Sequence, residues 1–134
     1  MRHWYLDSSI ALHVILPGGD ERARTWLDRV LASNEQIFSS VLLHLELTRV
    51  LRRERLDVAL ADLVLDRVDA ISINDAVLQS AAAIETHVKS LDAIHLASCM
   101  LLGPDVTVVT HDLAMSQVAQ SLDLDTTDPI ARSA

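Results

Sequence analysis

The sequence has little cysteine, little positive charge and no long apolar run. Its single cysteine, Cys99, excludes an intramolecular disulfide and a zinc site built on paired thiolates, so we expect it to be a small buried side chain. No stretch approaches the roughly 18 uninterrupted apolar residues that a membrane span needs. The N-terminus reaches Asp7 too early for a signal peptide. These absences predict a cytoplasmic protein that does not enter a membrane.

Positive charge is scarce along the whole chain. There are 11 Lys and Arg residues against 19 Asp and Glu residues, which gives a net charge of −8. This balance argues against a broad basic surface for nucleic acid, since such binding depends on neutralising phosphates. The basic charge is local instead, because the stretch TRVLRRER at 48–55 holds four of the eleven basic residues. A nucleic-acid site would need these residues gathered beside it.

Strand-like and helix-like segments alternate along the 134 residues, half of which are hydrophobic. This fits one globular domain over 1–134. The patterns predict strands at 2–7, 36–40, 70–73, 106–110 and 124–127, and helices at 8–16, 20–33, 41–54, 57–69, 74–87, 89–102 and 111–122. Such alternation implies parallel strands joined by right-handed crossovers. The expected fold is therefore α/β, a three-layer α/β/α sandwich with a central parallel sheet.

Four acidic residues stand out by their positions. Asp7 ends the first predicted strand, and Asp112 lies two residues past the β-branched run VTVVT. Both should face the carboxyl ends of the strands, where ligands bind in open α/β sheets. Glu46 lies in the largely apolar stretch VLLHLELTRVL. Asp92 stands one turn into the apolar helix KSLDAIHLASCMLL, where a buried carboxylate is costly unless it has a partner.

Each acid alone also has a structural explanation. The three aspartates could cap helices, and Glu46 could pair with Arg49 or Arg53 on its own helix face. Together the four acids favour a metal site. Hard divalent cations such as Mg²⁺ prefer carboxylate oxygens. A cation held in this way can activate water and stabilise the charge that builds on a phosphodiester under attack.

The stretches YLDSSIAL, SSVLLHLELTRVLRR, SLDAIHLAS and VVTHDLAM, in this order, resemble the PIN-domain family. More narrowly, they resemble the VapC-type toxin ribonucleases of bacterial toxin–antitoxin pairs, over residues 4 to about 126. The resemblance implies an endoribonuclease dependent on Mg²⁺ or Mn²⁺, with Asp7, Glu46, Asp92 and Asp112 as its metal-binding and catalytic residues. It also implies a homodimer neutralised by a cognate antitoxin. Many relatives carry a further acid where this chain has Ala114, so the number of metal ions, one or two, stays open.

Several polar residues near these acids have two explanations each. Ser8 is either a hydroxyl close to the metal or an ordinary helix cap, and for Thr110 a structural role is favoured. His95 has the spacing from Asp92 that can bind a metal from one helix face, although packing beside the site is favoured. No histidine belongs to a zinc signature such as HExxH.

The arginines that follow Glu46 are candidates for binding substrate. Arg49 and Arg53 fall three and seven residues after Glu46, so they share its helix face and either meet RNA phosphates or form a solvated basic face. A PIN-domain nuclease in RNA processing or repair is an alternative to a toxin, and so is a non-catalytic PIN-like module. A receiver-like module would need a Lys after a late strand, where this chain has none near Asp112. A haloacid-dehalogenase-type phosphatase would need an acid where Ser9 stands.

Overall fold

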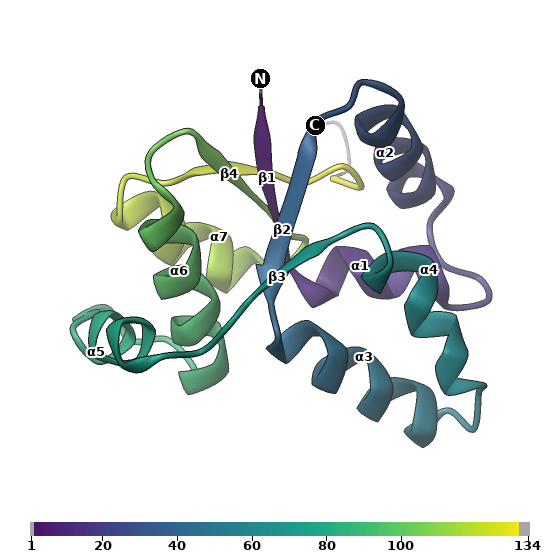
Figure 1. Cartoon of the computed structure of the whole chain (residues 1–134), viewed down its shortest axis with the longest axis horizontal. Coiled ribbons are helices and arrows are strands. Elements are labelled where there is room, and N and C mark those ends of the chain that lie inside the picture. The colour runs from purple at the N-terminus through teal and green to yellow at the C-terminus, as the bar shows by residue number, and fades with distance from the viewer. Residues whose placement is uncertain (1, 132–134) are drawn as a thin grey trace.

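In the computed structural model, which describes residues 2–131, five strands form one sheet with helices on both faces (Figure 1). The strands are β1 (His3–Leu6), β2 (Gln36–Ser40), β3 (Asp69–Ile71), β4 (Val106–Val109) and β5 (Asp125–Thr127). They lie in the order β3-β2-β1-β4-β5, and every neighbouring pair is parallel. This confirms the predicted α/β sandwich with a central parallel sheet.

The helices divide between the two faces of the sheet. They are α1 (Ser8–Ile15), α2 (Glu21–Ala32), α3 (Leu42–Arg53), α4 (Asp62–Leu65), α5 (Asp75–Ala82), α6 (Ser90–Leu102) and α7 (Leu113–Ser121), and a 3-10 turn, η1, spans Val58–Ala61. Alternate residues of a strand point to opposite faces. Trp4 and Leu6 of β1 therefore pack with α1 to α4, whereas Tyr5 packs with α6 and α7 (Figure 1).

The helix predicted at 57–69 is wrong in its extent. The structure has η1 followed by the single turn of α4, and the Asp57 side chain accepts a 2.9 Å hydrogen bond from the Ala59 N–H at the start of η1. Ala61 and Val64 are buried, but Leu63 is 51% exposed. The segment therefore packs Ala61 and Val64 into the core through two short helical turns instead of one long helix.

The helix predicted at 74–87 is also too long. It starts as expected, with the Asn74 side chain accepting a 3.0 Å hydrogen bond from the Val77 N–H, but it ends at Ala82. Ile84 and Val88 then pack against the core on the α6 and α7 face, so the chain turns there before α6 begins. Every other predicted element agrees with the structure to within two residues at either end.

Two smaller expectations concern α1 and α6. The helix predicted at 8–16 ends just before the PGG stretch at 17–19: Gly18 has φ 79°, and Gly19 lies so close to the His13 carbonyl that a Cβ would not fit. Cys99 is free and fully buried, and burial raises the pKa of its thiol to about 12, so it is the packing side chain that we expected. None of the described helices is long and apolar enough to span a membrane.

The strand order creates a switch point between β1 and β4. From β1 the chain moves outward through β2 to β3, and it then crosses back to place β4 and β5 on the other side of β1. Crossovers that run in opposite directions leave a crevice at the carboxyl ends of the two central strands. Asp7 follows β1 directly and Thr110 follows β4 directly, so both residues lie at this crevice.

Candidate active site

Asp7 is held by several donors at the end of β1. The residue is 4% exposed, and its Oδ2 accepts hydrogen bonds from Ser9 Oγ at 2.6 Å and from Thr110 Oγ1 at 2.8 Å. The Ser9 N–H also donates to this oxygen, at 3.4 Å, which makes Asp7 the N-cap of α1. The two explanations considered from the sequence therefore coexist: Asp7 is both a helix cap and a buried carboxylate at the crevice.

Asp112 caps α7 on the other side of the crevice. Its Oδ1 accepts a 3.2 Å hydrogen bond from the Met115 N–H, and its own N–H donates to Thr110 Oγ1 at 3.0 Å. Thr110 is 2% exposed and contacts both Asp7 and Asp112 through one hydroxyl. Thr110 thus has the structural role that we favoured, and the structure that it supports is the acidic site.

Glu46 approaches the acids from α3, and its partner lies on a different helix. Its Oε1 is 2.6 Å from His95 Nε2, and the Ser8 hydroxyl donates to Oε2 over 3.5 Å. Within residues 2–131, Glu46 forms no ion pair with Arg49 or Arg53. The alternative in which Glu46 serves as half of an ion pair on its own helix is therefore wrong.

His95 is buried, and both of its ring nitrogens are engaged. Nε2 faces Glu46, and Nδ1 is 2.8 Å from the hydroxyl oxygen of Tyr5. The favoured explanation, packing beside the site, agrees with this geometry, which leaves neither nitrogen for a metal. Burial alone would lower the pKa of His95. The hydrogen bond to Glu46 and the charges of Glu46, Asp7 and Asp92 outweigh burial, so the pKa is raised.

Asp92 lies in the first turn of α6 but does not cap it. Lys89 occupies the N-cap position, and no residue within 2–131 donates a hydrogen bond to the Asp92 carboxylate, in contrast to the other three acids. Burial raises the pKa of Asp92, and the charges of Asp7, Asp112 and Glu46 raise it further. Asp92 therefore lies within electrostatic range of the other acids and lacks a donor that would stabilise its charge.

The four acids are the residues that could hold a metal ion. They come from the end of β1, from α3, from α6 and from the start of α7, and they provide only oxygen donors. Among residues 2–131, no three His, Cys, Asp or Glu side chains form a ready-made metal cluster. Mg²⁺ does not require one, since it keeps several waters and is bound by one or two carboxylates together with substrate phosphates. The donor chemistry fits such an ion.

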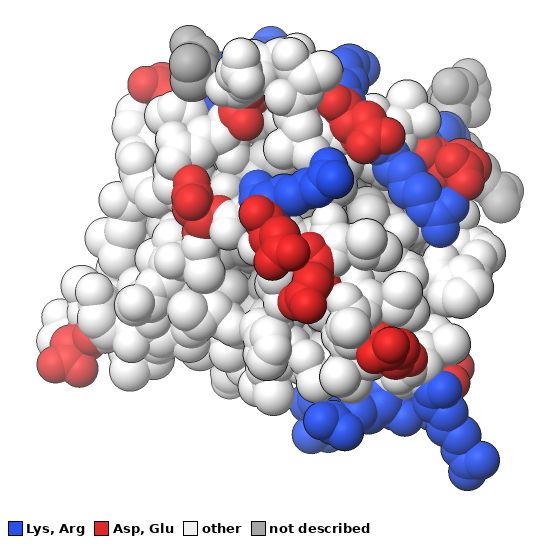
Figure 2. Space-filling model, turned by 45° about the vertical axis from the view of Figure 1, so that its right-hand side comes forward, with Lys and Arg blue, Asp and Glu red and all other residues white. Residues whose placement is uncertain are grey.

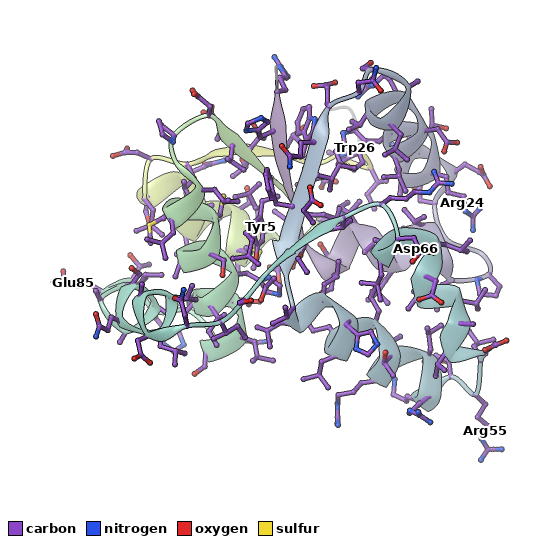
Figure 3. All side chains as sticks on the ribbon, in the orientation of Figure 1. Tyr5, Arg24, Trp26, Arg55, Asp66 and Glu85 are labelled. Carbon is purple, nitrogen blue, oxygen red and sulfur yellow. The ribbon has the colours of Figure 1, made fainter. Side chains whose placement is uncertain are left out.

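A groove that includes Glu46 runs along α3. It has a volume of about 460 Å³ and is lined by Ser8, Leu12, Leu45, Glu46, Arg49, Val50, Arg53 and Leu91. Ser8, Arg49 and Arg53, the polar residues singled out in the sequence around Asp7 and Glu46, therefore share one groove with an acid of the site. Figure 2 shows Lys and Arg side chains gathered at the lower margin of the molecule, and Figure 3 labels Arg55 there, just beyond α3. A larger hollow of about 670 Å³ lies at the amino ends of the strands, away from the acids.

Two residues that hold the site in place were not predicted. Ser9, and not Ser8, is the hydroxyl that binds Asp7, and its Oγ also accepts a 2.8 Å hydrogen bond from the His111 N–H. This role requires the loop after β4 to meet α1, which no local sequence signal reveals. Tyr5 could have been found, because strand alternation places it on the same side of the sheet as Asp7.

Comparisons with known proteins agree with this architecture. Residues 4–121 match the family model described as PIN domain. Comparison with curated proteins finds no match. Among solved structures, the fold is similar to that of a chain in VapBC2 from Rickettsia felis bound to a DNA fragment from their promoter, with a TM-score of 0.74 and 15% identity over 94% of this chain and 98% of that chain.

Two further solved structures share the fold. One is a toxin–antitoxin complex from Klebsiella pneumoniae, with a TM-score of 0.74 and 18% identity over 96% of this chain and 98% of that chain. The other is FitAcB from Neisseria gonorrhoeae, with a TM-score of 0.67 and 19% identity over 94% of this chain and 97% of that chain. At these identities the three structures establish a common fold.

Proposed function

This chain belongs to the PIN-domain family of nucleases, and from that premise we propose that it is a metal-dependent endoribonuclease, the toxin of a toxin–antitoxin pair. The observation that carries the proposal is the gathering of Asp7, Glu46, Asp92 and Asp112 at the switch point of the sheet. Like charges that lie near one another at the edge of a protein interior repel, and burial strengthens the repulsion. Acids placed together in this way are costly unless a cation offsets their charge.

The four acids are assigned as the ligands of Mg²⁺ or Mn²⁺ and as the catalytic residues. Such an ion supplies Lewis acidity, which activates water and stabilises charge on a phosphodiester. Ser9 and Thr110 hold Asp7 in one orientation, and the Ser8 hydroxyl faces Glu46 at the mouth of the groove. Asp92 has no hydrogen-bond donor within residues 2–131, so its carboxylate gains most from a cation.

RNA is the proposed substrate, and the groove along α3 is its proposed path. Arg49 and Arg53 are exposed and line this groove beside Glu46. A single strand that follows the groove would bring its phosphates past both guanidinium groups on the way to the acids. This arrangement suits a chain with a net charge of −8, because positive charge is needed only along the substrate path.

The same groove is the proposed docking site of an antitoxin. Leu45 and Leu91 line it and are 49% and 46% exposed, so apolar surface lies beside basic residues. A protein segment with apolar side chains and a carboxylate would suit such a surface. The similar structure from Klebsiella pneumoniae is itself a toxin–antitoxin complex.

A homodimer is part of the same proposal, and sedimentation of the purified chain measures its assembly state.

Incubation of purified protein with total RNA, with and without Mg²⁺, tests the proposed activity. We expect cleavage that stops in EDTA and in the variants Asp7→Asn and Asp92→Asn, because an amide cannot supply the charge that a hard cation needs. Asp105→Asn is the matched control, since Asp105 is an exposed acid just before β4, at the opposite end of the sheet. Undiminished cleavage by Asp7→Asn or Asp92→Asn would remove that residue from the site, and cleavage in EDTA would refute the metal dependence.

A further inference from the structure

Three side chains form a buried hydrogen-bonded chain from the core to the acidic site. The Tyr5 hydroxyl lies 2.8 Å from His95 Nδ1, and His95 Nε2 lies 2.6 Å from Glu46 Oε1. Tyr5 and His95 are each 1% exposed, whereas the Glu46 side chain is 19% exposed. Figure 3 labels Tyr5 in the layer between the sheet and α6. This series of hydrogen bonds therefore begins at Tyr5 in the buried interior and ends at Glu46, an acid of the site.

From this geometry we propose that His95 is a positioning residue for Glu46 and that Tyr5 fixes the orientation of the His95 ring. The inference rests on the function proposed above, in which Glu46 is a metal ligand. A free glutamate side chain populates many rotamers, and holding it in one of them costs conformational entropy. His95 holds Oε1, so Oε2 is left toward Ser8 and the groove.

The Glu46 carboxylate and the Tyr5 hydroxyl together favour the tautomer of His95 that carries its proton on Nε2, because the carboxylate only accepts and the phenol can donate to Nδ1. Burial raises the pKa of Tyr5, so Tyr5 stays a neutral phenol that can donate. When the imidazole is neutral, donation from Tyr5 to Nδ1 leaves the proton on Nε2, and Nε2–H donates to Glu46. When the imidazole is protonated, Nε2–H still donates to Glu46, and Nδ1–H donates to the Tyr5 oxygen. A donor faces Glu46 in both states.

Groups that hold metal ligands in place contribute to metal affinity without touching the metal. Losing such a group costs about 10-fold to 100-fold in metal affinity or activity. The Tyr5 and His95 pair is well suited to this role, because the two rings also pack edge to face, with centroids 5.8 Å apart. The imidazole therefore cannot turn away from Glu46 without disturbing the packing between β1 and α6.

Binding of Mn²⁺, measured by titration calorimetry without RNA, tests the proposal independently of cleavage. We expect His95→Leu, which removes the donor, to lower Mn²⁺ affinity about 10-fold to 100-fold. His95→Gln places an amide N–H near the position of Nε2 and should stay within about 5-fold of wild type. Cys99→Ala is the control for packing, since Cys99 is fully buried on the same helix and should bind Mn²⁺ like wild type.

The outcomes separate the proposal from a purely structural role. If His95→Leu and His95→Gln both bind Mn²⁺ with wild-type affinity, His95 does not position Glu46 through its N–H. The same conclusion follows if both variants lose Mn²⁺ affinity by the same factor. If circular dichroism shows that His95→Leu does not fold, the variant Tyr5→Phe tests the proposal instead. We expect this variant to lose affinity about 10-fold and to shift the ¹⁵N resonances of His95 away from the Nε2–H tautomer, and unchanged affinity and tautomer would overturn the proposal. Wild-type protein that binds no Mn²⁺ refutes the proposed metal site itself.

Discussion

Thr110 Oγ1 donates a 2.8 Å hydrogen bond to Asp7 Oδ2, and this bond joins residues 103 positions apart in the chain. The two residues follow the two central strands, β1 and β4, on either side of the switch point. The same hydroxyl accepts the N–H of Asp112 at 3.0 Å. One buried side chain therefore fixes the relative positions of two of the four acids.

Replacing Thr110 with Val keeps the shape of the side chain and removes this hydroxyl. Asp7 loses a donor, and the Asp112 N–H loses an acceptor, so we expect the free energy of unfolding in urea to fall by about 1–3 kcal/mol. Thr107→Val is the control, because Thr107 lies on β4, three residues before Thr110, and makes no side-chain hydrogen bond within residues 2–131. Its effect should stay within about 0.5 kcal/mol. Equal losses in the two variants would contradict a special role for Thr110.

Neutralising Asp92 should stabilise the protein when no metal is present. Asp92→Asn keeps the shape of the side chain and removes one of several like charges, so in EDTA we expect this variant to exceed wild type by about 1 kcal/mol. With millimolar Mg²⁺ the wild type should gain more, because a ligand stabilises in proportion to its binding of the folded state. Thermal melts of both proteins measure the difference. A variant that is no more stable than wild type in EDTA and gains equally from Mg²⁺ would show that Asp92 is not part of a cluster.

The stability gap between these two proteins should also depend on pH. The raised pKa of Asp92 means that the folded protein binds this proton more tightly than the unfolded chain, in which the carboxyl titrates near 3.8. The resulting stability is fully present below pH 3.8 and is lost as pH rises through the folded pKa. In EDTA, the free energy of unfolding of wild type should therefore fall relative to that of Asp92→Asn as pH rises through this window. Above the folded pKa of Asp92, the difference between the two proteins should stay constant. Urea midpoints at intervals from pH 3.5 to 8 measure the gap, and a gap independent of pH would count against the raised pKa.

His95 should produce a second pH dependence, near neutrality. Its pKa is raised above the ordinary value of 6.5 in the folded protein, because Glu46 and the nearby acids outweigh burial. This contribution to stability is fully present below pH 6.5 and is lost as pH rises through the folded pKa. Wild type should therefore exceed His95→Gln by more at pH 6 than at pH 9 in EDTA. Denaturant titrations at both pH values give the comparison, and the opposite ordering would mean that the pKa is lowered.

Removing the two groove arginines should flatten the salt dependence of RNA binding. Each lost phosphate contact lowers the slope of log affinity against log salt by about 0.7 for a single strand, so Arg49→Ala with Arg53→Ala should lower it by about 1.4. The control is Arg29→Ala with Arg67→Ala, which removes the same charge from exposed positions that do not line the groove. Binding to a labelled RNA in EDTA at several salt concentrations measures both slopes. Identical slopes in the two double variants would show that Arg49 and Arg53 do not contact RNA phosphates and form a solvated basic face instead.

Local sequence signals determined the sheet and the places of two acids. β-branched runs and helical spacing predicted every strand and most helices to within two residues, because these patterns record which face of each element is buried. Asp7 and Asp112 could be placed because a residue that follows a parallel strand and caps the next helix must lie at the carboxyl edge of the sheet. The segment at 57–69 was predicted as one helix, and its periodicity did not reveal that the helical turns stop at Leu65.

The contacts of the four acids follow from how distant elements pack against one another. From the sequence, Glu46 could pair with an arginine on its own helix. In the fold its partner is His95, which lies 49 residues away on α6. The sequence singled out Ser8 beside Asp7, but the loop after β4 brings Thr110 to Ser9, and these two hydroxyls hold Asp7. Residue type and spacing along the chain identify which side chains can carry charge. Contacts between elements that are distant in sequence determine which of these side chains receive a hydrogen-bond donor. Asp92 is the acid for which these contacts provide none within residues 2–131.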